Sequence, residues 1–227
     1  MRIYLIRHGM TAGNREHRYV GSTDEKLLED AKESLREKQL EWSFLQEVDQ
    51  VCVSPMLRCV QTAELLFPGR EFVHVSDFRE CDFGRFEYKD YEELNGDADY
   101  QRFIDTMGRS GFPEGESRES FQKRCVQGFY DVMDGIWNEK RIDKEWQDGE
   151  ISAINRKMKD SSLALVVHGG TIMAILDALA VPHRDYYDWQ IGNGEGFVAE
   201  ELLWEESVQS GNVSEGKSWR LSEVHRI

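Results

Sequence analysis

Short apolar runs alternate with amphipathic segments along most of the chain. Three runs are typical of buried strands: residues 3–6, Val51-Cys52-Val53 and residues 163–167. Each is too short for a helix, and a continuous apolar run without alternation is expected of strands that are covered on both faces. A further strand is predicted at residues 72–75.

Helical spacing of apolar residues characterises four other segments. Residues 25–42 predict an exposed amphipathic helix amid dense charge, and residues 56–67 predict a second helix. From residue 117 to 136, apolar side chains recur at steps of three and four, which predicts a long helix with one buried face. An apolar helix is predicted from about Thr171 to Ala180.

This alternation of strand and helix patterns predicts an α/β fold. We expect a three-layer α/β/α arrangement, with a mainly parallel sheet covered by helices and right-handed crossovers. No internal repeat, low-complexity tract or linker interrupts the sequence, so we predict a single domain over residues 1–227. Residues 138–162 are highly charged and are predicted to form a surface excursion, and residues 79–86 are predicted to be irregular.

Composition and charge exclude several classes of protein. A chain of 227 residues with 40% hydrophobic residues and only four prolines is expected to fold as a globular protein. Its net charge of −15 argues against nucleic acid or an anionic membrane as a partner, because both require a broad basic surface. The apolar runs fall far short of the roughly 20 residues of a membrane helix, and no signal-peptide core is present, so a cytoplasmic location is predicted.

The four cysteines carry no motif. None of them is spaced as C-x-x-C, and four cysteines are too few for a disulfide scaffold in a chain of this length. We therefore expect reduced thiols that are mostly buried.

Unusual residues occur where the predicted buried strands end. Arg7-His8-Gly9, residues 54–58 and His168-Gly169-Gly170 each follow such a strand. Ligands of open α/β sheets bind outside the carboxyl ends of the strands, so the three loops are expected to converge on one site. The glycines after His8 and His168 allow a sharp turn and a close approach of the ligand.

Two imidazoles and two arginines on one rim suit a multiply charged anion. Arg7 and Arg58 offer planar sets of donors that match phosphate oxygens, and Arg58 also lies near the start of its predicted helix. The chain up to Thr23 is locally basic although the protein is acidic, with Arg2, Arg7, Arg15 and Arg18 against Glu16. A phosphoryl group is therefore the expected ligand. A metal site is disfavoured, because there is no H-x-H or H-x-x-x-H pair and arginines flank the histidines.

These residues resemble the arginine-histidine-glycine signature of the histidine phosphatase superfamily, which includes phosphoglycerate mutases and acid phosphatases. The similarity comprises Leu5 to Thr11 with Asn14, Ser54 to Arg58 with Gln61-Thr62-Ala63, Glu80 with Phe83-Gly84, Gly115-Glu116-Ser117, and Val166 to Gly170. Five blocks in this order span nearly the whole chain, so the chain is identified as a member of the superfamily with a phosphoglycerate mutase-like fold.

The resemblance implies a set of roles. His8 would be the nucleophile that takes the phosphoryl group as a phosphohistidine, and a neutral imidazole is indeed a good nucleophile at neutral pH. Glu80 would give its proton to the leaving group. The phosphate oxygens would be held by Arg7, Arg58 and His168, with Asn14 as a neighbour of the phosphate. No metal and no cofactor is implied.

The segment from Arg79 to Glu87 bears on the reaction. It is similar to the phosphatases of the superfamily, in particular to α-ribazole phosphatases and small broad-specificity enzymes, and it lacks the glutamate-arginine-x-tyrosine-glycine run of mutases. The implied function is hydrolysis of a small phosphomonoester, such as α-ribazole 5′-phosphate or a sugar phosphate. A mutase-type phosphotransferase and a non-catalytic phosphate-binding regulatory module are the alternatives.

One position departs from the pattern of these phosphatases. Phe86-Glu87-Tyr88 stands where they usually have tryptophan-glutamate-glycine, so that a bulky ring replaces a small residue. The sequence predicts neither the physiological substrate nor the oligomeric state.

Overall fold

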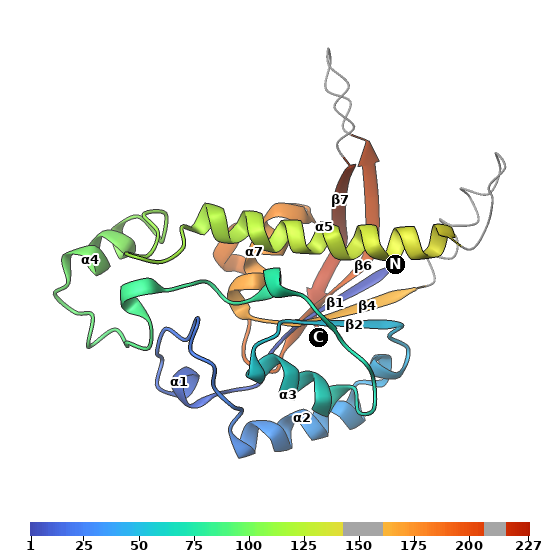
Figure 1. Cartoon of the computed structure of the whole chain (residues 1–227), viewed down its shortest axis with the longest axis horizontal. Coiled ribbons are helices and arrows are strands. Elements are labelled where there is room, and N and C mark those ends of the chain that lie inside the picture. Colours follow the sequence, from blue (N-terminus) through green and yellow to red (C-terminus); the bar gives the residue numbers. More distant parts are fainter. Residues whose placement is uncertain (143–160, 207–216) are drawn as a thin grey trace, which may run out of the picture.

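A seven-stranded sheet forms the centre of the protein, of which the computed structural model describes residues 1–142, 161–206 and 217–227 (Figure 1). The strands are β1 (Arg2–Arg7), β2 (Gln50–Val53), β3 (Val73–His74), β4 (Ser162–Val167), β5 (Ala180–Val181), β6 (Gly196–Glu206) and β7 (Lys217–Arg226). Their order in the sheet is β3-β2-β4-β1-β6-β7-β5, and only β6 pairs in antiparallel fashion, with β1 and with β7. The predicted α/β fold with a mainly parallel sheet is confirmed.

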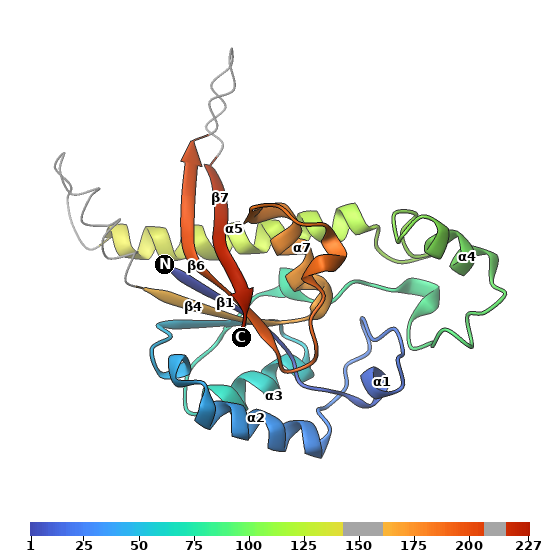
Figure 2. The same ribbon diagram turned by 180° about the vertical axis from the view of Figure 1, so that it is seen from behind.

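Helices cover the sheet on both faces. The helices of the described residues are α1 (Ala12–Arg15), α2 (Glu29–Glu41), α3 (Leu57–Leu66), α4 (Ala98–Asp105), α5 (Arg118–Ile142) and α7 (Gly169–Leu179), with short 3-10 turns η1 (Ser43–Gln46), η2 (Ser76–Phe78), η3 (Gly84–Phe86) and η4 (Tyr186–Trp189). Helices α5 and α7 lie on one side of the strands and α2 and α3 on the other, as the two opposite views show (Figures 1 and 2). This is the three-layer arrangement that the sequence predicts.

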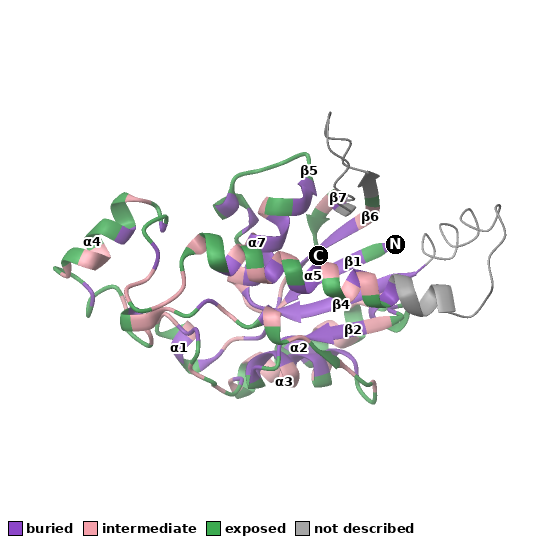
Figure 3. Cartoon of the chain, turned by 45° about the horizontal axis from the view of Figure 1, so that its top comes forward, coloured by how far each residue is buried: buried purple, intermediate pink, exposed green. Residues whose placement is uncertain are grey.

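The central strands divide their side chains between two cores. In β1, Ile3 and Leu5 belong to the core beneath α5 and α7, whereas Tyr4 and Ile6 belong to the core beneath α2 and α3. Successive side chains of a strand point to opposite faces, so a strand covered on both faces must be apolar at every position. The purple strands at the centre of Figure 3 show this burial.

The predictions were wrong or incomplete in three places. The helix expected from residue 25 begins only at Glu29, because Leu27 is buried and pairs with Thr11 in an isolated antiparallel bridge. Leu40, one of the apolar residues whose spacing predicts this helix, is 82% exposed. The hairpin of β6 and β7 was not predicted.

Other predictions concern cysteines and the charged segment. Cys52, Cys59, Cys81 and Cys125 are all free and buried, as predicted. Of the excursion predicted at 138–162, the first residues belong to α5, and residues 143–160 lie outside the described part of the chain. The single-domain organisation stays a prediction. Within the described ranges, no helix is long and apolar enough to cross a membrane.

Residues 77–88, here called the lip, lead from η2 across to the small layer around α4. Apart from the two 3-10 turns, the lip has no regular secondary structure, as predicted for residues 79–86. At its far end, Phe86 of the lip forms a third, smaller core with Leu94 and Phe103, and Tyr19 and Phe112 pack against this core. The lip thus joins the main core to this outlying aromatic layer.

Candidate active site

The ends of β1 and β4 bring two histidines together. The strands pair in parallel with Arg7 opposite Val167, so the residues that follow, His8 and His168, are neighbours at the edge of the sheet. Their ring centroids are 5.2 Å apart at an interplanar angle of 68°, and both rings are buried. The predicted convergence of these loops is therefore present in the fold.

The tautomer of His8 follows from a hydrogen bond of its ring. Nδ1 lies 2.7 Å from the carbonyl oxygen of Gly9. Because a carbonyl oxygen only accepts, Nδ1 carries the hydrogen and donates it, and the lone pair is on Nε2. Burial, and then the charges of Arg58 and Arg7, hold the pKa of His8 well below its usual value of 6.5, so the ring is neutral at neutral pH.

His168 is neutral for the same reasons and is oriented by two side chains. Burial lowers its pKa far below the usual value, with Arg58 as the next cause. Arg58 Nε donates to Nδ1 across 3.3 Å, so Nε2 carries the hydrogen and donates to Ser54 Oγ at 2.8 Å. Ser54, at the end of β2, is a site residue whose role sequence reasoning missed.

Arg58 is fully buried in the first turn of α3, where the sequence predicts it. Its Nη1 donates to the carbonyl of Thr23 at 2.8 Å, and its Nη2 to the carbonyl of Gly21 at 2.9 Å. Those two residues are held in turn by Glu87 of the lip, whose Oε1 accepts from the Gly21 N–H at 3.0 Å and the Thr23 N–H at 2.9 Å. The lip therefore helps to place the guanidinium, and sequence reasoning missed this function of Glu87.

Arg7 presents a buried donor with no partner. Its Nη1 donates to the carbonyl of Ile191 at 2.6 Å, but Nε is buried and makes no hydrogen bond. Gly169, at the start of α7, lies against this group: a Cβ there would be 3.2 Å from Nε. An unpaired buried N–H is costly, so its presence at a predicted ligand site favours an anion as its partner.

Asn14 supports the His8 loop from outside. Its Oδ1 accepts from the N–H of Thr11 at 3.4 Å and from Nδ2 of Asn193 at 3.1 Å. Asn193 Nδ2 also lies 3.2 Å from the carbonyl oxygen of His8. Asn193 was not predicted, and its signal in the sequence is only that glycines flank it.

Glu80 lies at the same edge of the sheet, next to the turn that follows His168. Its Oε1 accepts from the N–H of Cys81 at 3.0 Å and its Oε2 from the N–H of Gly170 at 3.3 Å. A Cβ on Gly170 would lie 2.3 Å from Glu80 Oε1, which explains the second glycine after His168. Burial raises the pKa of Glu80 above its usual value of 4.5, against the smaller opposing effects of these N–H groups and Arg58.

Tyr88 adopts a left-handed backbone conformation at the position where the similar phosphatases usually have glycine. Its φ of 60° lies in the left-handed region, which costs a residue other than glycine about 1 kcal/mol. The ring is anchored at the same time, since its hydroxyl donates to Glu25 Oε1 at 2.9 Å and its N–H to the Tyr19 carbonyl at 2.7 Å. The turn therefore survives the replacement of glycine.

The site brings together two guanidinium groups, two neutral imidazoles and the carboxyl group of Glu80. In the part of the chain that the structure describes, no three His, Cys, Asp or Glu side chains are grouped to hold a metal ion. The arrangement can bind a phosphate with buried N–H donors, present a nitrogen lone pair to it and supply a proton from the lip.

Comparisons with known proteins identify the family of the chain. A model of the histidine phosphatase superfamily (branch 1) matches residues 3–200. The uncharacterized phosphatase PhoE of Bacillus subtilis (strain 168) is 23% identical over 183 residues, which cover 78% of this chain and 77% of that protein.

Solved structures share the fold. A phosphoglycerate mutase from Thermus thermophilus superposes with a TM-score of 0.61 at 25% identity, covering 88% of this chain and 93% of that one. A structure from Escherichia coli K-12, solved under the name of an alpha-ribazole-5'-P phosphatase, gives a TM-score of 0.65 at 18% identity over 97% and 95% of the two chains. The chain belongs to the histidine phosphatase superfamily (branch 1) and is a phosphatase of that family, a phosphomonoesterase.

Proposed function

We propose that this phosphatase needs no metal ion and passes the phosphoryl group of its substrate through His8 to water. The observation that carries the proposal is the state of His8: its imidazole is buried and neutral, Gly9 engages Nδ1–H, and the lone pair is on Nε2. Positive charge for the phosphate oxygens comes from Arg58 and Arg7, which supply donors in place of a metal ion.

In the first step, Nε2 of His8 attacks phosphorus, an N–P bond forms and the P–O bond to the leaving group breaks. The electron pair of that bond stays on the leaving oxygen, which takes the proton of Glu80. Because burial raises the pKa of Glu80, the carboxyl group keeps its proton at a higher pH than an exposed glutamate does.

In the second step, a water molecule attacks phosphorus and gives a proton to the Glu80 carboxylate. The N–P bond breaks, its electron pair returns to Nε2, and inorganic phosphate leaves. Phosphoryl transfer depends mostly on positioning and on stabilising charge on the oxygens, which is the role we assign to Arg7, Arg58 and His168 with Asn14 nearby. In this role the Nε2–H of His168 exchanges its bond to Ser54 Oγ for one to a phosphate oxygen.

The substrate class that we propose is a small phosphorylated metabolite, with α-ribazole 5′-phosphate and sugar phosphates as candidates. An aromatic cluster begins three residues after Glu80: the rings of Phe83 and Tyr19 lie 5.3 Å apart, and those of Phe83 and Phe112 lie 4.8 Å apart. Aromatic faces suit a flat or partly apolar leaving group on the side of the acid.

The test is hydrolysis of phenyl phosphate in excess chelator by the wild type, His8→Ala and Glu80→Ala, with His74→Ala as the matched control on the exposed strand β3. We expect turnover to persist with chelator, to vanish in His8→Ala and to fall sharply in Glu80→Ala. A panel of sugar phosphates and α-ribazole 5′-phosphate then ranks substrates.

Two outcomes contradict the proposal. A reaction that needs bisphosphoglycerate as a primer and returns the phosphoryl group to a sugar acid identifies a mutase. A wild type that is inert on every substrate but binds vanadate identifies a phosphate-binding module.

A further inference from the structure

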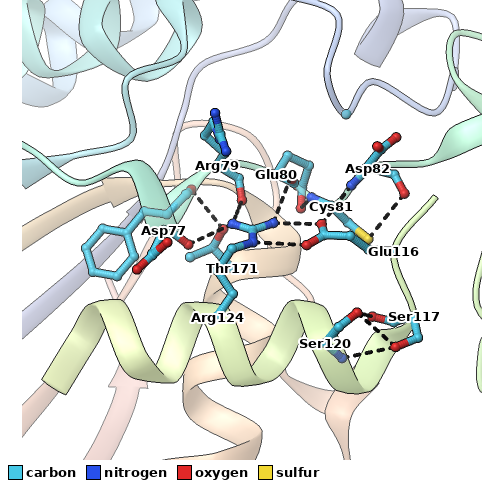
Figure 4. A network of polar contacts seen from close by, with 12 residues as sticks. Asp77, Arg79, Glu80, Cys81, Asp82, Glu116, Ser117, Ser120, Arg124 and Thr171 are labelled. Carbon is cyan, nitrogen blue, oxygen red and sulfur yellow. Dashed lines mark hydrogen bonds and ion pairs between the residues drawn. The ribbon is translucent and has the colours of Figure 1, made fainter. Parts of the chain in front are cut away.

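The side chain of Arg124, in the second turn of α5, contacts main-chain carbonyl groups of the lip (Figure 4). Its Nη1 donates to the carbonyl oxygens of Asp77 at 2.8 Å and Arg79 at 3.0 Å, and its Nη2 lies 3.4 Å from the carbonyl oxygen of Glu80. One guanidinium therefore engages three carbonyl groups in four consecutive residues. Helices and strands satisfy their own carbonyls, so such a contact is needed where the chain has neither.

Glu116 completes the contact from the turn before α5. Its carboxylate accepts from Arg124 Nε at 3.0 Å and from Arg124 Nη2 at 2.7 Å, a bidentate pair. The same carboxylate accepts from the N–H of Asp82 at 3.0 Å, and the N–H of Glu116 donates to the Asp82 carbonyl at 2.9 Å. Arg124 and Glu116 thus bind the backbone of the lip on both sides of Glu80.

The place of the Glu80 carboxylate depends on this main chain. Its two hydrogen bonds come from backbone N–H groups, of Cys81 within the lip and of Gly170 outside it. The second bond forms only while the lip lies at the right distance from α7. A shift of the lip therefore separates the acid from the turn that carries His168.

The pair acts on position and adds little net charge. Arg124 contacts the carbonyl oxygen of Glu80, and its charge is balanced by Glu116 at 2.7 Å. An unbalanced arginine at this distance would favour the ionised form of a neighbouring carboxyl group. The bidentate pair avoids this effect and still provides five donors in a planar arrangement, which a lysine cannot.

We propose that Arg124 and Glu116 are positioning residues that hold Glu80 where it gives its proton to the leaving group. The inference rests on the proposed function of Glu80. It assigns a role to the Gly115-Glu116-Ser117 motif, which the proposed mechanism leaves without one. Neither side chain touches the substrate in this role, and both act through the backbone of residues 77–82.

The proposal predicts a dependence on the leaving group. Phenolate and alkoxide leaving groups need a proton, whereas 2,4-dinitrophenolate is a weak base and departs without one. In Arg124→Gln and Glu116→Gln, we expect hydrolysis of phenyl phosphate to fall roughly 10²-fold, within the usual contribution of a general acid. Rapid-quench measurement of the first turnover of 2,4-dinitrophenyl phosphate is expected to show a burst of near wild-type rate, followed by slow release of phosphate.

The control is Arg85→Gln, which breaks the ion pairs of a lip arginine with Asp97 and Asp99 and leaves the carbonyls of residues 77–80 untouched. A second readout is the double variant Glu80→Gln/Arg124→Gln. If Arg124 acts through Glu80, its substitution costs almost nothing once the acid is absent. The milder variant Glu116→Gln serves if Arg124→Gln unfolds, and a thermal melt identifies that case.

The outcomes separate the two proposals. Equal losses for both leaving groups, or an undiminished loss in the Glu80→Gln background, overturn the positioning role and leave Arg124 a structural residue. A wild type that hydrolyses no substrate overturns the proposed function itself, and the positioning role with it.

Discussion

The floor of the site and its lip are built in different ways. The floor, formed by Arg7, His8, Arg58 and His168, lies at the ends of β1 and β4 and in the first turn of α3, with both imidazoles buried. The lip carries Glu80 on a segment that is irregular apart from its 3-10 turns, held by side-chain bonds from Arg124 and Glu116 to its backbone. His8 is therefore placed by the sheet, and Glu80 by a few polar contacts. Substitutions in the floor are expected to affect stability and rate together, and those in the lip mainly the rate.

The largest effect is expected in the floor, for Arg58→Lys. The buried guanidinium satisfies the carbonyls of Thr23 and Gly21 and orients His168, and an ammonium group cannot make all of these bonds. We expect kcat/KM to fall about 10⁴-fold, as for arginines that stabilise transferring phosphoryl groups. Loss of the hydrogen bonds to these carbonyl groups is expected to lower the free energy of unfolding by about 3 kcal/mol, measured by urea denaturation. A stable but inactive variant would show that Arg58 is a ligand-binding residue only.

The next effect concerns the lip, in Glu80→Gln. The amide is nearly isosteric but gives no proton, so kcat is expected to fall about 10³-fold. Because burial penalises the carboxylate, we expect the free energy of unfolding at pH 8 to be unchanged or higher. Phenyl phosphate turnover measures the fall in kcat, and urea denaturation measures the free energy of unfolding. A large loss of stability would mean that the lip is as much a part of the folded core as the floor is.

Gly170→Ala tests the contact between the two regions. The new Cβ would lie 2.3 Å from Glu80 Oε1, the end of a side chain that can rotate away, so the fold is expected to survive. Displacement of the acid is expected to lower kcat about 10²-fold, and the loss should disappear in the Glu80→Gln background. Gly135→Ala is the control, because a Cβ there meets nothing within 4 Å. Wild-type turnover in Gly170→Ala would contradict the described place of Glu80.

A further effect, on stability alone, is a pH dependence that belongs to the floor. His8 and His168 have pKa values well below 6.5 in the folded protein, so the unfolded chain binds more protons below pH 6.5. Their contribution is complete above pH 6.5 and is lost as the pH falls below it. For each histidine the loss is about 1.4 kcal/mol per pH unit until the folded-state pKa is reached.

Urea denaturation between pH 7 and pH 5 measures this slope. His8→Gln is expected to remove about half of it, and His74→Gln, on the exposed strand β3, none. If the slope is unchanged in His8→Gln, the imidazole of His8 binds its proton as readily in the folded protein as in the unfolded chain.

The difference between the floor and the lip also explains which parts of the site could be predicted from the sequence. His8 and His168 follow apolar runs and precede glycine, so their convergence follows from the rule that strand ends form the site of an α/β sheet. The partners of Arg58 could not be found in this way. Backbone carbonyls such as those of Thr23 and Gly21 are present in every residue and leave no mark on the sequence.

The lip was the least predictable part for a physical reason. Its conformation is set by Arg124, more than 40 positions from the backbone it contacts, and by the fit of Glu87 to the loop of Gly21. Neither of these contacts produces a periodic pattern in the sequence. Without the family resemblance, Glu80 is one of 43 acidic residues, and its contact with Gly170 and its raised pKa become visible in the structure alone.

The short hydrogen bond between His8 Nδ1 and the Gly9 carbonyl also determines which compound the proposed reaction forms. Histidine can be phosphorylated on either ring nitrogen, and the two isomers are distinct chemical species. With Nδ1 committed to a main-chain acceptor in a buried loop, only Nε2 is free to bond to phosphorus. Protein trapped during turnover is therefore expected to contain a single positional isomer, so that ³¹P NMR of the denatured protein shows one phosphohistidine resonance.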